Sequence, residues 1–319
     1  MKLFRRPTSI SLTGGLGNQL FQLAAGLYVT KNEPLILEWK LAKPRLNHFN
    51  LPEISSFVLP SQVEFLGETK ESFFASKAVG YVLRQGINPR TYERLVGFRF
   101  VSKLLANSVI SFNLKRLTLL RVSRGVGFSK LSRSDRGKLL IGYFQTYRYL
   151  DDPEILKSMR KIQINEMTAR IKYFSELADV ENPLIVHIRL GDYKNEKLFG
   201  TPSLEFYNSA IKQLLSTGNY SKVWVFSDEP DLARQLFKTA IPANARWIYS
   251  KSDSSAQTLE IMRHGKGYVI ANSTFSWWAA TLSYTLNPAV IAPEPWFRFL
   301  ESPKDLIPRN WYLLPGWID

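Results

Sequence analysis

The feature that most constrains the fold is an alternation in the second half of the chain. Short, mostly apolar runs recur there, and segments of helical length separate them. Continuous apolar runs of this length are typical of strands buried in a parallel sheet. Strands that alternate with helices predict βαβ units and a doubly wound α/β sheet. The runs are residues 184–189, 223–226, 247–249, 268–271 and 289–292, and the helical segments are 204–215, 231–238, 256–263 and 274–286.

The first half opens in the same way. Residues 10–13 predict a strand, the glycine-rich residues 14–17 a turn, and a helix is expected from Asn18 onward. Leu16, Leu20, Leu23 and Leu27 lie on one stripe of that helix because their spacing is three and four. Further strands are expected at residues 35–38 and 139–144, and the weakly patterned residues 54–138 are expected to form helices and loops.

A helix start near the middle of the chain marks the expected domain boundary. Asp152 is a candidate N-cap and Pro153 suits the first helical position. A chain of 319 residues is long enough for two domains. We therefore expect an N-terminal domain over residues 1–150 and a C-terminal domain over residues 151–319 that includes the C-terminal tail.

Composition excludes several classes of protein. The chain is 45% hydrophobic and contains no cysteine, so disorder, disulfides and thiolate metal sites are not expected. No apolar run reaches the roughly 18 residues that span a bilayer. The first residues lack the apolar core of a secretory signal. These features predict a cytoplasmic protein.

The net charge of +15 suggests a polyanionic partner. Twelve basic residues lie between Arg90 and Lys138, opposed by Glu93 and Asp135 alone. This basic stretch is either a solvated surface or a contact for an anionic membrane or a lipid-pyrophosphate acceptor, which would place the protein peripherally on the inner face of the membrane. Nucleic acid is not an expected partner, because no recognised RNA- or DNA-binding motif is present.

Three polar motifs follow predicted strands of the second domain, at residues 187–192, 226–230 and 272–276. The carboxyl ends of strands in open α/β sheets border the ligand site, so three such loops suggest one site. His187 and Arg189 share a face of their strand because they are two residues apart. The arginine fork suits a diphosphate. A core histidine and a structural ion pair between Arg189 and Asp192 remain the alternative.

The other two motifs also have two readings. Ser273 or Thr274 could be a plain N-cap, or the helix start could additionally bind a phosphate. Asp228 and Glu229 could cap the helix from Pro230, or could accept hydrogen bonds from guanine.

The glycine-rich turn at residues 14–19 resembles a phosphate loop but lacks the spacing of the dinucleotide and Walker motifs. It could face a cleft between the domains, or it could be a turn needed only for packing. The sequence also lacks a D-x-D motif, and His48, His187 and His264 are too scattered to suggest zinc. We therefore expect no metal.

Together these motifs resemble glycosyltransferase family 11, the α-1,2-fucosyltransferases. Similar segments are Gly-Gly-Leu-Gly-Asn-Gln at residues 14–19, Gly-Tyr-Phe-Gln at 142–145, His-Ile-Arg-Leu-Gly-Asp-Tyr at 187–193, Phe-Ser-Asp-Glu at 226–229 and Asn-Ser-Thr-Phe-Ser-Trp-Trp at 272–278. The resemblance covers both ends and most of the second half, whereas residues 50–138 match poorly. It implies a GT-B-like fold, with two Rossmann-like domains that face each other across a cleft.

The resemblance also implies an activity. The enzyme would transfer L-fucose from GDP-fucose, with inversion and without a metal, to a galactose-type hydroxyl of an oligosaccharide or lipid-linked surface glycan. Arg189 would contact the β-phosphate and offset charge on the leaving GDP. The implied donor-binding or sugar-facing residues are His187, Ser227, Asp228, Asn272, Ser273, Thr274 and Ser276 in the second domain and Gly15, Gly17, Asn18 and Gln19 in the first.

Three departures from the family pattern concern the donor and the linkage. Leu190 stands where the family has a second arginine, Glu229 replaces an aspartate, and Ala279 follows the paired tryptophans in place of glycine. Asp192 is the candidate base for the acceptor hydroxyl, with structural pairing to Arg189 as its alternative. The alternatives to fucosyl transfer are a different nucleotide sugar or linkage, an inactive relative suggested by Leu190, and a basic nucleic-acid-binding protein.

Overall fold

The computed structural model describes residues 7–39, 44–66, 110–112, 118–123, 127–191, 199–250, 252–299, 301–303 and 305–317. The chain forms two compact units. Unit 1 is Met1–Gln163 with Pro303–Leu306, and unit 2 is Ile164–Ser302 with Ile307–Asp319. The boundary expected after residue 150 precedes helix α5 (Pro153–Arg160), which lies within unit 1. Asp152 caps α5 and Pro153 is its first residue, which confirms the predicted helix start.

Unit 1 contains a six-stranded sheet in the order β4-β2-β1-β7-β6-β5. Its pairs are parallel except for β5 with β6, so most of its strands are joined by crossovers. The strands are β1 (Thr8–Ser11), β2 (Leu35–Glu38), β4 (Val63–Phe65), β5 (Ile110–Phe112), β6 (Thr118–Val122) and β7 (Leu139–Ile141). The short elements β3 (Phe57–Val58), η1 (Glu53–Ser56), η3 (Arg133–Asp135) and η4 (Arg148–Asp151) complete the unit, and β8 (Gln163–Ile164) lies at its end.

Helix α1 (Leu16–Thr30) lies at the centre of unit 1. Every residue of α1 except Asn18 and Tyr28 is buried, so the predicted leucine stripe is only part of its packed surface. A Cβ added to Gly26 would lie 2.7 Å from the Leu35 side chain, which shows how closely α1 approaches β2. Arg136 contacts the C-terminal end of α1, where its guanidinium donates to the carbonyl groups of Val29 and Thr30. A cation at that position complements the helix dipole.

Unit 2 contains a second six-stranded sheet, in which every pair is parallel, in the order β11-β10-β9-β12-β13-β14. Strand β9 is buried along its whole length. Its register with β10 runs from Pro183 opposite Lys222 to Ile188 opposite Ser227. The strands are β9 (Pro183–Ile188), β10 (Lys222–Ser227), β11 (Arg246–Trp247), β12 (Gly267–Val269), β13 (Ala289–Glu294) and β14 (Tyr312–Pro315).

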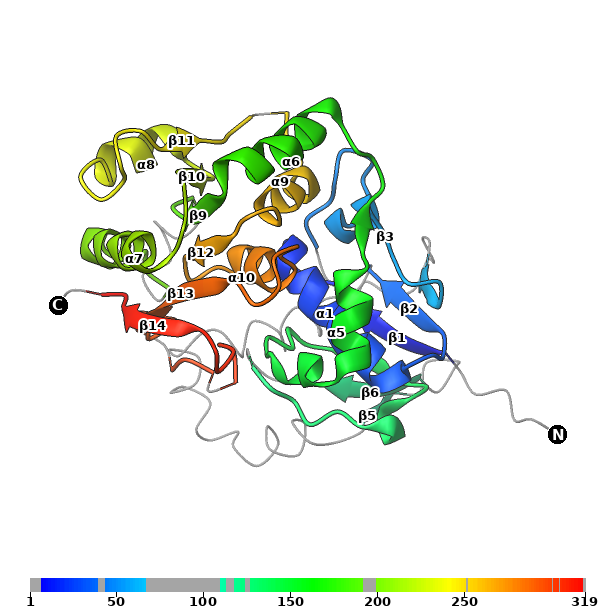
Figure 1. The fold of residues 1–319 in the computed structure, drawn as a ribbon. Helices are drawn as coiled ribbons and strands as arrows, with labels where there is room; N and C mark the ends of the chain where they lie inside the picture. Colours follow the sequence, from blue (N-terminus) through cyan, green and yellow to red (C-terminus); the bar gives the residue numbers. More distant parts are fainter. Residues whose placement is uncertain are drawn as a thin grey trace. The chain divides into compact units, whose positions relative to one another are not determined.

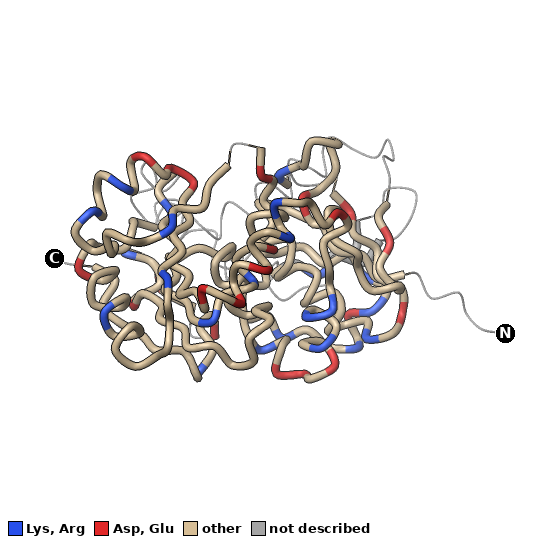
Figure 2. The backbone as a smooth tube through the Cα atoms, turned by 45° about the horizontal axis from the view of Figure 1, so that its top comes forward, with Lys and Arg blue, Asp and Glu red and all other residues tan. Residues whose placement is uncertain are grey.

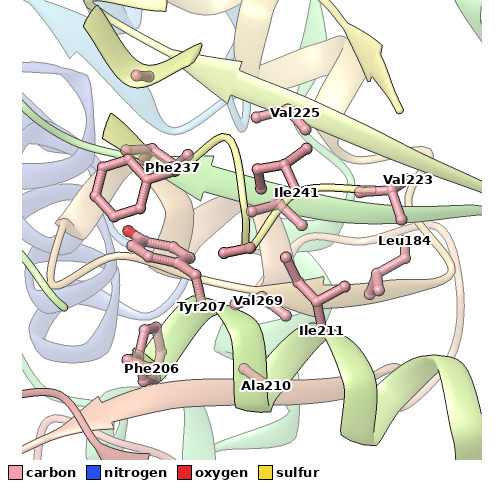
Figure 3. Close-up of a cluster of buried hydrophobic side chains, with 14 of the residues drawn as sticks. Leu184, Phe206, Tyr207, Ala210, Ile211, Val223, Val225, Phe237, Ile241 and Val269 are labelled. Atoms are coloured by element: carbon pink, nitrogen blue, oxygen red, sulfur yellow. The ribbon is translucent and has the colours of Figure 1, made fainter. Parts of the chain in front are cut away.

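Helices cover both faces of this sheet, as the doubly wound pattern predicts. Figure 1 shows α7 (Leu204–Thr217) and α8 (Pro230–Leu236) on one face, and α6 (Ala169–Glu181), α9 (Ser255–Met262) and α10 (Thr274–Thr281) on the other. Alternate residues of β9 therefore meet different helices. Leu184, Val186 and Ile188 join the hydrophobic core under α7 and α8 (Figure 3), whereas His187 lies beside Phe275 of α10.

A buried ion pair at the end of α9 also contacts the end of α10. Arg263 and Glu260 are each 1% exposed and lie 2.8 Å apart. The Arg263 Nε also donates to the carbonyl of Leu282, the C-cap residue of α10, at 3.0 Å. An unpaired charge at this depth would be costly, so these contacts satisfy both groups and fix the position of α10.

The expectation of helices and loops for residues 54–138 is wrong in part where the structure describes them, because β3, β4, β5 and β6 are strands. Strand β7 ends at Ile141 rather than at residue 144, and it pairs with β1 and β6 inside the sheet. Helix α10 ends at Thr281 rather than at residue 286. Helix α6 and strand β14 were not predicted.

Only part of the basic stretch lies within the described residues, and three of its cations there contact acidic side chains. Arg136 lies 2.5 Å from Glu33, and Lys138 and Arg121 lie 2.8 and 3.8 Å from Asp135. Figure 2 shows basic and acidic residues intermixed along the chain. The predicted contact with an anionic membrane stays a prediction. Within the described ranges, no helix is both long and apolar enough to cross a membrane.

Leu190 offers a test of the core under α7 and α8, because it is 3% exposed and belongs to that cluster. We expect Leu190→Ala to lower the free energy of unfolding by about 2–5 kcal/mol, since it removes buried methyl groups and leaves a cavity. Urea unfolding followed by circular dichroism would measure the loss. Leu286→Ala is the matched control, because Leu286 is 76% exposed and its truncation should change little. Equal effects of the two substitutions would contradict this packing.

Candidate functional site

The order of strands in unit 2 identifies the edge where a ligand is expected. From β9 the chain passes to β10 and β11 on one side, and β12, β13 and β14 lie on the other side. Ligands of open α/β sheets bind outside the carboxyl ends of the strands at such a reversal of order. Val186 pairs with Val269, so the residues that follow β9 and β12, Arg189 and Asn272, leave the sheet at the same edge. Two of the three predicted motifs therefore flank this point, and Asp228 follows the neighbouring strand β10.

Asp228 contacts three successive residues after β9. Its Oδ1 accepts the backbone N–H of Leu190 at 2.9 Å, and its Oδ2 accepts that of Gly191 at 3.1 Å. The same Oδ2 lies 3.0 Å from Nη1 of Arg189. The predicted capping of the helix from Pro230 by these carboxylates is wrong, because Glu229 is the N-cap residue of α8 and no side-chain hydrogen bond caps the helix. The carboxylate of Asp228 is thus engaged by the loop that carries Arg189.

Gly191 is required by this contact. A Cβ on Gly191 would lie 2.4 Å from the Oδ2 atom of Asp228, which is closer than such atoms can approach. The glycine of the predicted motif therefore lets the carboxylate reach two backbone N–H groups at once.

His187 is 4% exposed and its ring centroid lies 5.9 Å from that of Phe275. Burial is the main reason that the pKa of His187 is lowered to about 4; the Asp228 carboxylate opposes this change and the Arg189 charge adds to it. The imidazole is therefore neutral at pH 7. Among the described residues, its Nδ1 atom is buried and has no hydrogen-bond partner.

The segment after β12 begins α10. Ser273 is the N-cap residue, and its hydroxyl accepts the N–H of Phe275 at 3.3 Å, which confirms the predicted cap. Asn272 is buried and donates from its amide to the carbonyl groups of Phe199 and Gly200 at 3.0 and 3.1 Å. Asn272 thus fixes the chain that returns toward the site, and Thr274, the first helical residue, is half-buried.

Two predicted donor-binding side chains have structural partners. Ser276 is fully buried, and its hydroxyl donates to Ser273 or Ala271 within the protein at 3.2 and 3.4 Å. The expectation that this hydroxyl contacts a phosphate is not supported by its position. The Ser227 hydroxyl accepts the backbone N–H of Glu229 at 3.1 Å and shapes the turn after β10.

Unit 1 has its own reversal of strand order between β1 and β7, since β2 and β4 lie on one side of β1 and β7 on the other. Buried amides join the two strand ends. The Gln22 side chain accepts the N–H of Thr13 at 3.0 Å and donates to the carbonyl of Gly142 at 2.9 Å. Gln145 donates to the side-chain oxygen of Asn18 at 2.8 Å. Asn18 is half-buried at this point.

The glycine-rich turn is fixed by Gln19 and Glu53. Gln19 is fully buried and contacts Gly14, Arg45 and Ile54 through their backbones, so its predicted contact with a sugar is not supported by its position. The carboxylate of Glu53 accepts the N–H of Leu16 at 2.6 Å. An acidic group therefore already lies at the N-terminus of α1, beside the N-cap residue Gly15, and Gly17 is buried in the first turn.

Sequence reasoning missed Gln22, Gln145, Glu53 and the contacts of Asp228. Gln145 lies inside one of the motifs quoted above, whereas Gln22 lies three residues beyond the glycine-rich motif at residues 14–19. Glu53 gave no sequence signal, since it follows a proline in a weakly patterned loop.

Asp192, the candidate base, lies outside the described residues. Within the residues that the structure describes, no cluster of three or more acidic or histidine side chains could hold a metal ion.

Each unit has a mostly parallel sheet with polar residues at the carboxyl ends of its strands. These features define a ligand-binding protein of the Rossmann-like class. The chain belongs to glycosyl transferase family 11, whose model matches residues 142–314. The predicted family is therefore confirmed, and the protein is a glycosyltransferase. The predicted α/β class with two Rossmann-like units is also confirmed, whereas the GT-B-like arrangement of the units across a cleft stays a prediction.

The chain is similar to two proteins of Escherichia coli along nearly its whole length. It is 28% identical to an alpha-1,2-colitosyltransferase, with 94% of this chain and 96% of that protein covered. It is 26% identical to the O-antigen biosynthesis glycosyltransferase WbnK, with 90% and 93% covered. Among solved structures, fucosyltransferase NodZ from Bradyrhizobium is 14% identical with a TM-score of 0.47, over 93% of this chain and 99% of that chain.

The depressed pKa of His187 predicts a dependence of stability on pH. Between about pH 6.5 and pH 4 the unfolded chain binds a proton that the folded chain excludes, so stability falls as the pH is lowered. At pH 5 this loss is on the order of 1–2 kcal/mol. His187→Gln should flatten the curve of unfolding free energy against pH in this range. His48→Gln, at an exposed position, is the control, and parallel curves for wild type and His187→Gln would refute the prediction.

Proposed function

We propose that this glycosyltransferase is an inverting, GDP-sugar-dependent α-1,2-fucosyltransferase. Its acceptor is a galactose-type hydroxyl of a surface glycan, either as a free oligosaccharide or linked to lipid. The observation that carries the proposal is the position of Arg189. This residue follows the central strand β9, level with the start of α10, and an ion pair and two neighbouring backbone contacts fix its loop.

Arg189 is proposed to bind the β-phosphate of the donor. As the acceptor oxygen bonds to the anomeric carbon, the bond from that carbon to the phosphate oxygen breaks, and its electron pair leaves with GDP. A fixed guanidinium stabilises that negative charge more in the transition state than in the ground state. The acceptor proton passes to a base, for which Asp192 remains the candidate.

The start of α10 supports the same proposal. The first N–H groups of a helix lack partners within the helix, and the helix dipole favours an anion at this end. Ser273 is a neutral cap, so the protein adds no negative charge there from the cap itself. Thr274 and the backbone N–H groups of this turn are the proposed contacts for the diphosphate.

Base and sugar contacts complete the proposed donor site. The neutral imidazole of His187 is proposed to hydrogen-bond the guanine or ribose, because its Nδ1 atom is buried and has no partner within the described residues. Asn18, held by Gln145 at the strand reversal of unit 1, is the proposed contact for the transferred sugar or the acceptor. The proposal requires no metal, since Arg189 and the helix start supply the positive potential.

Colitosyl transfer is a second candidate, and the 28% identity to an alpha-1,2-colitosyltransferase favours it. It keeps the proposed site and changes only the sugar. Turnover with GDP-fucose compared with turnover of the corresponding colitosyl donor would distinguish the two, since the preferred donor has the higher kcat/KM.

GDP should stabilise the protein against heat. At 100 times its Kd, a ligand that binds only the folded state adds about 2.7 kcal/mol. We expect GDP to raise Tm clearly, UDP and CMP to raise it far less, and EDTA to leave both the GDP shift and the transfer activity unchanged. Equal shifts with GDP and UDP would refute the guanine assignment. Loss of activity in EDTA that Mg²⁺ or Mn²⁺ restores would refute metal independence.

Arg189→Ala should lower kcat on the order of 10²–10³-fold without unfolding the protein, because one fixed donor to the leaving phosphate is lost. Arg189→Lys should restore activity only in part, since a lysine lacks the bidentate fork. Steady-state kinetics with melting curves would measure both effects. Near-normal turnover of Arg189→Ala in a folded protein would contradict the role proposed for this residue.

A further inference from the structure

We propose that Asp228 acts as a positioning residue for Arg189 and does not read the guanine base. This inference rests on the proposed GDP-sugar site. It differs from the role that the family resemblance implies for Asp228, which is a contact with guanine or ribose.

The geometry that carries the inference is a three-point contact. The two carboxylate oxygens of Asp228 accept the consecutive N–H groups of Leu190 and Gly191 at 2.9 and 3.1 Å, and one of them also pairs with Arg189 at 3.0 Å. All three partners belong to the turn that follows β9. The carboxylate therefore fixes the backbone of this turn and the direction of the guanidinium together.

Recognition of guanine by a carboxylate would need the same two oxygens. Guanine presents two adjacent donors, N1–H and the 2-amino group, and each would take one oxygen. In this structure each oxygen of Asp228 is directed at a backbone N–H of the turn, and the Oδ2 atom is also shared with Arg189. A carboxylate oxygen accepts about two hydrogen bonds, and Oδ2 already takes two donors, so reading the base through both oxygens would displace Gly191 or Arg189.

Gly191 supports the same inference from the other side of the contact. Any side chain at this position would place a Cβ 2.4 Å from the Oδ2 atom of Asp228. The turn is thus shaped so that the carboxylate can approach its backbone. The Arg189 and Asp228 side chains are only 18% and 24% exposed, so water competes weakly for the pair.

Asp228→Asn should disrupt the positioning while keeping the size of the side chain. The amide nitrogen of the asparagine is itself a donor and cannot accept a hydrogen bond. In one orientation it would face the donors of Gly191 and Arg189, and in the flipped orientation it would face the N–H of Leu190. Loss of a residue that orients a ligand-binding group typically costs 10–100-fold. We therefore expect kcat for transfer to fall by about this factor, with a smaller loss of GDP affinity.

A double-mutant cycle with Arg189→Ala distinguishes positioning from base recognition. If Asp228 acts through Arg189, Asp228→Asn should cause little further loss of GDP affinity or kcat in the Arg189→Ala protein. If Asp228 binds guanine, its loss should be the same in both backgrounds. Calorimetry with GDP and with IDP, which lacks the 2-amino group, adds a direct readout, and the GDP-to-IDP affinity ratio should be unchanged by Asp228→Asn.

Asp231→Asn is the matched control, because the Asp231 side chain is 97% exposed three residues further along, and it should behave as wild type. Should Asp228→Asn fail to fold, Gly191→Ala displaces the same carboxylate and should reproduce the kinetic loss. Additive losses in the cycle, or a GDP-to-IDP ratio that falls toward one in the variant, would overturn the inference. Absence of GDP binding by the wild-type protein would instead overturn the proposed function.

Discussion

The parallel pairing of β9 with β10 and β12 is the interaction on which unit 2 depends. It buries β9 along its whole length and brings the turns after three strands to one edge of the sheet. Polar groups on such a strand lose their water, so each must be paired or neutral. Arg189 meets this requirement through Asp228, and His187 meets it by staying uncharged. The chemistry of the site thus follows from the position of its strand.

Successive side chains of β9 point to opposite faces of the sheet, so one face packs against the core and the other faces the candidate site. Leu184, Val186, Ile188 and Leu190 face α7 and α8, where the surroundings are apolar. Leu190 stands where the family motif has a second arginine, and a guanidinium at this position would be buried among hydrocarbon side chains without a partner in that cluster. The substitution therefore fits the packing of this chain, and the charge of the motif is concentrated in Arg189 on the opposite face.

Periodicity predicted the elements that are buried and missed those that are not. Strands β9, β10 and β13 have continuous apolar runs, whereas β14 is an exposed edge and α6 buries only Ile171, Phe174 and Ala178. Motif positions placed the site at the correct strand ends. The contacts within it could not be predicted, because partners such as Gln22 and Gly142 are 120 residues apart and no local pattern records which oxygen meets which N–H. Ser276 and Gln19 illustrate the same limit, since both lie in motifs but point into the protein.

The two units contain the same strand–turn–helix arrangement, but the protein caps the starts of the two helices differently. At α1 the protein supplies its own anion, because the Glu53 carboxylate accepts the N–H of Leu16. At α10 the cap is the neutral hydroxyl of Ser273, and Arg189 follows the adjacent strand. The start of α1 is thus already engaged by a side chain of the protein, whereas the start of α10 has a neutral cap and remains suited to an anion. Neutral hydroxyl groups of a sugar, in contrast, are compatible with the amides and carboxylate of unit 1. This difference fits the proposed function, in which unit 2 binds the charged part of the donor and unit 1 binds uncharged sugar.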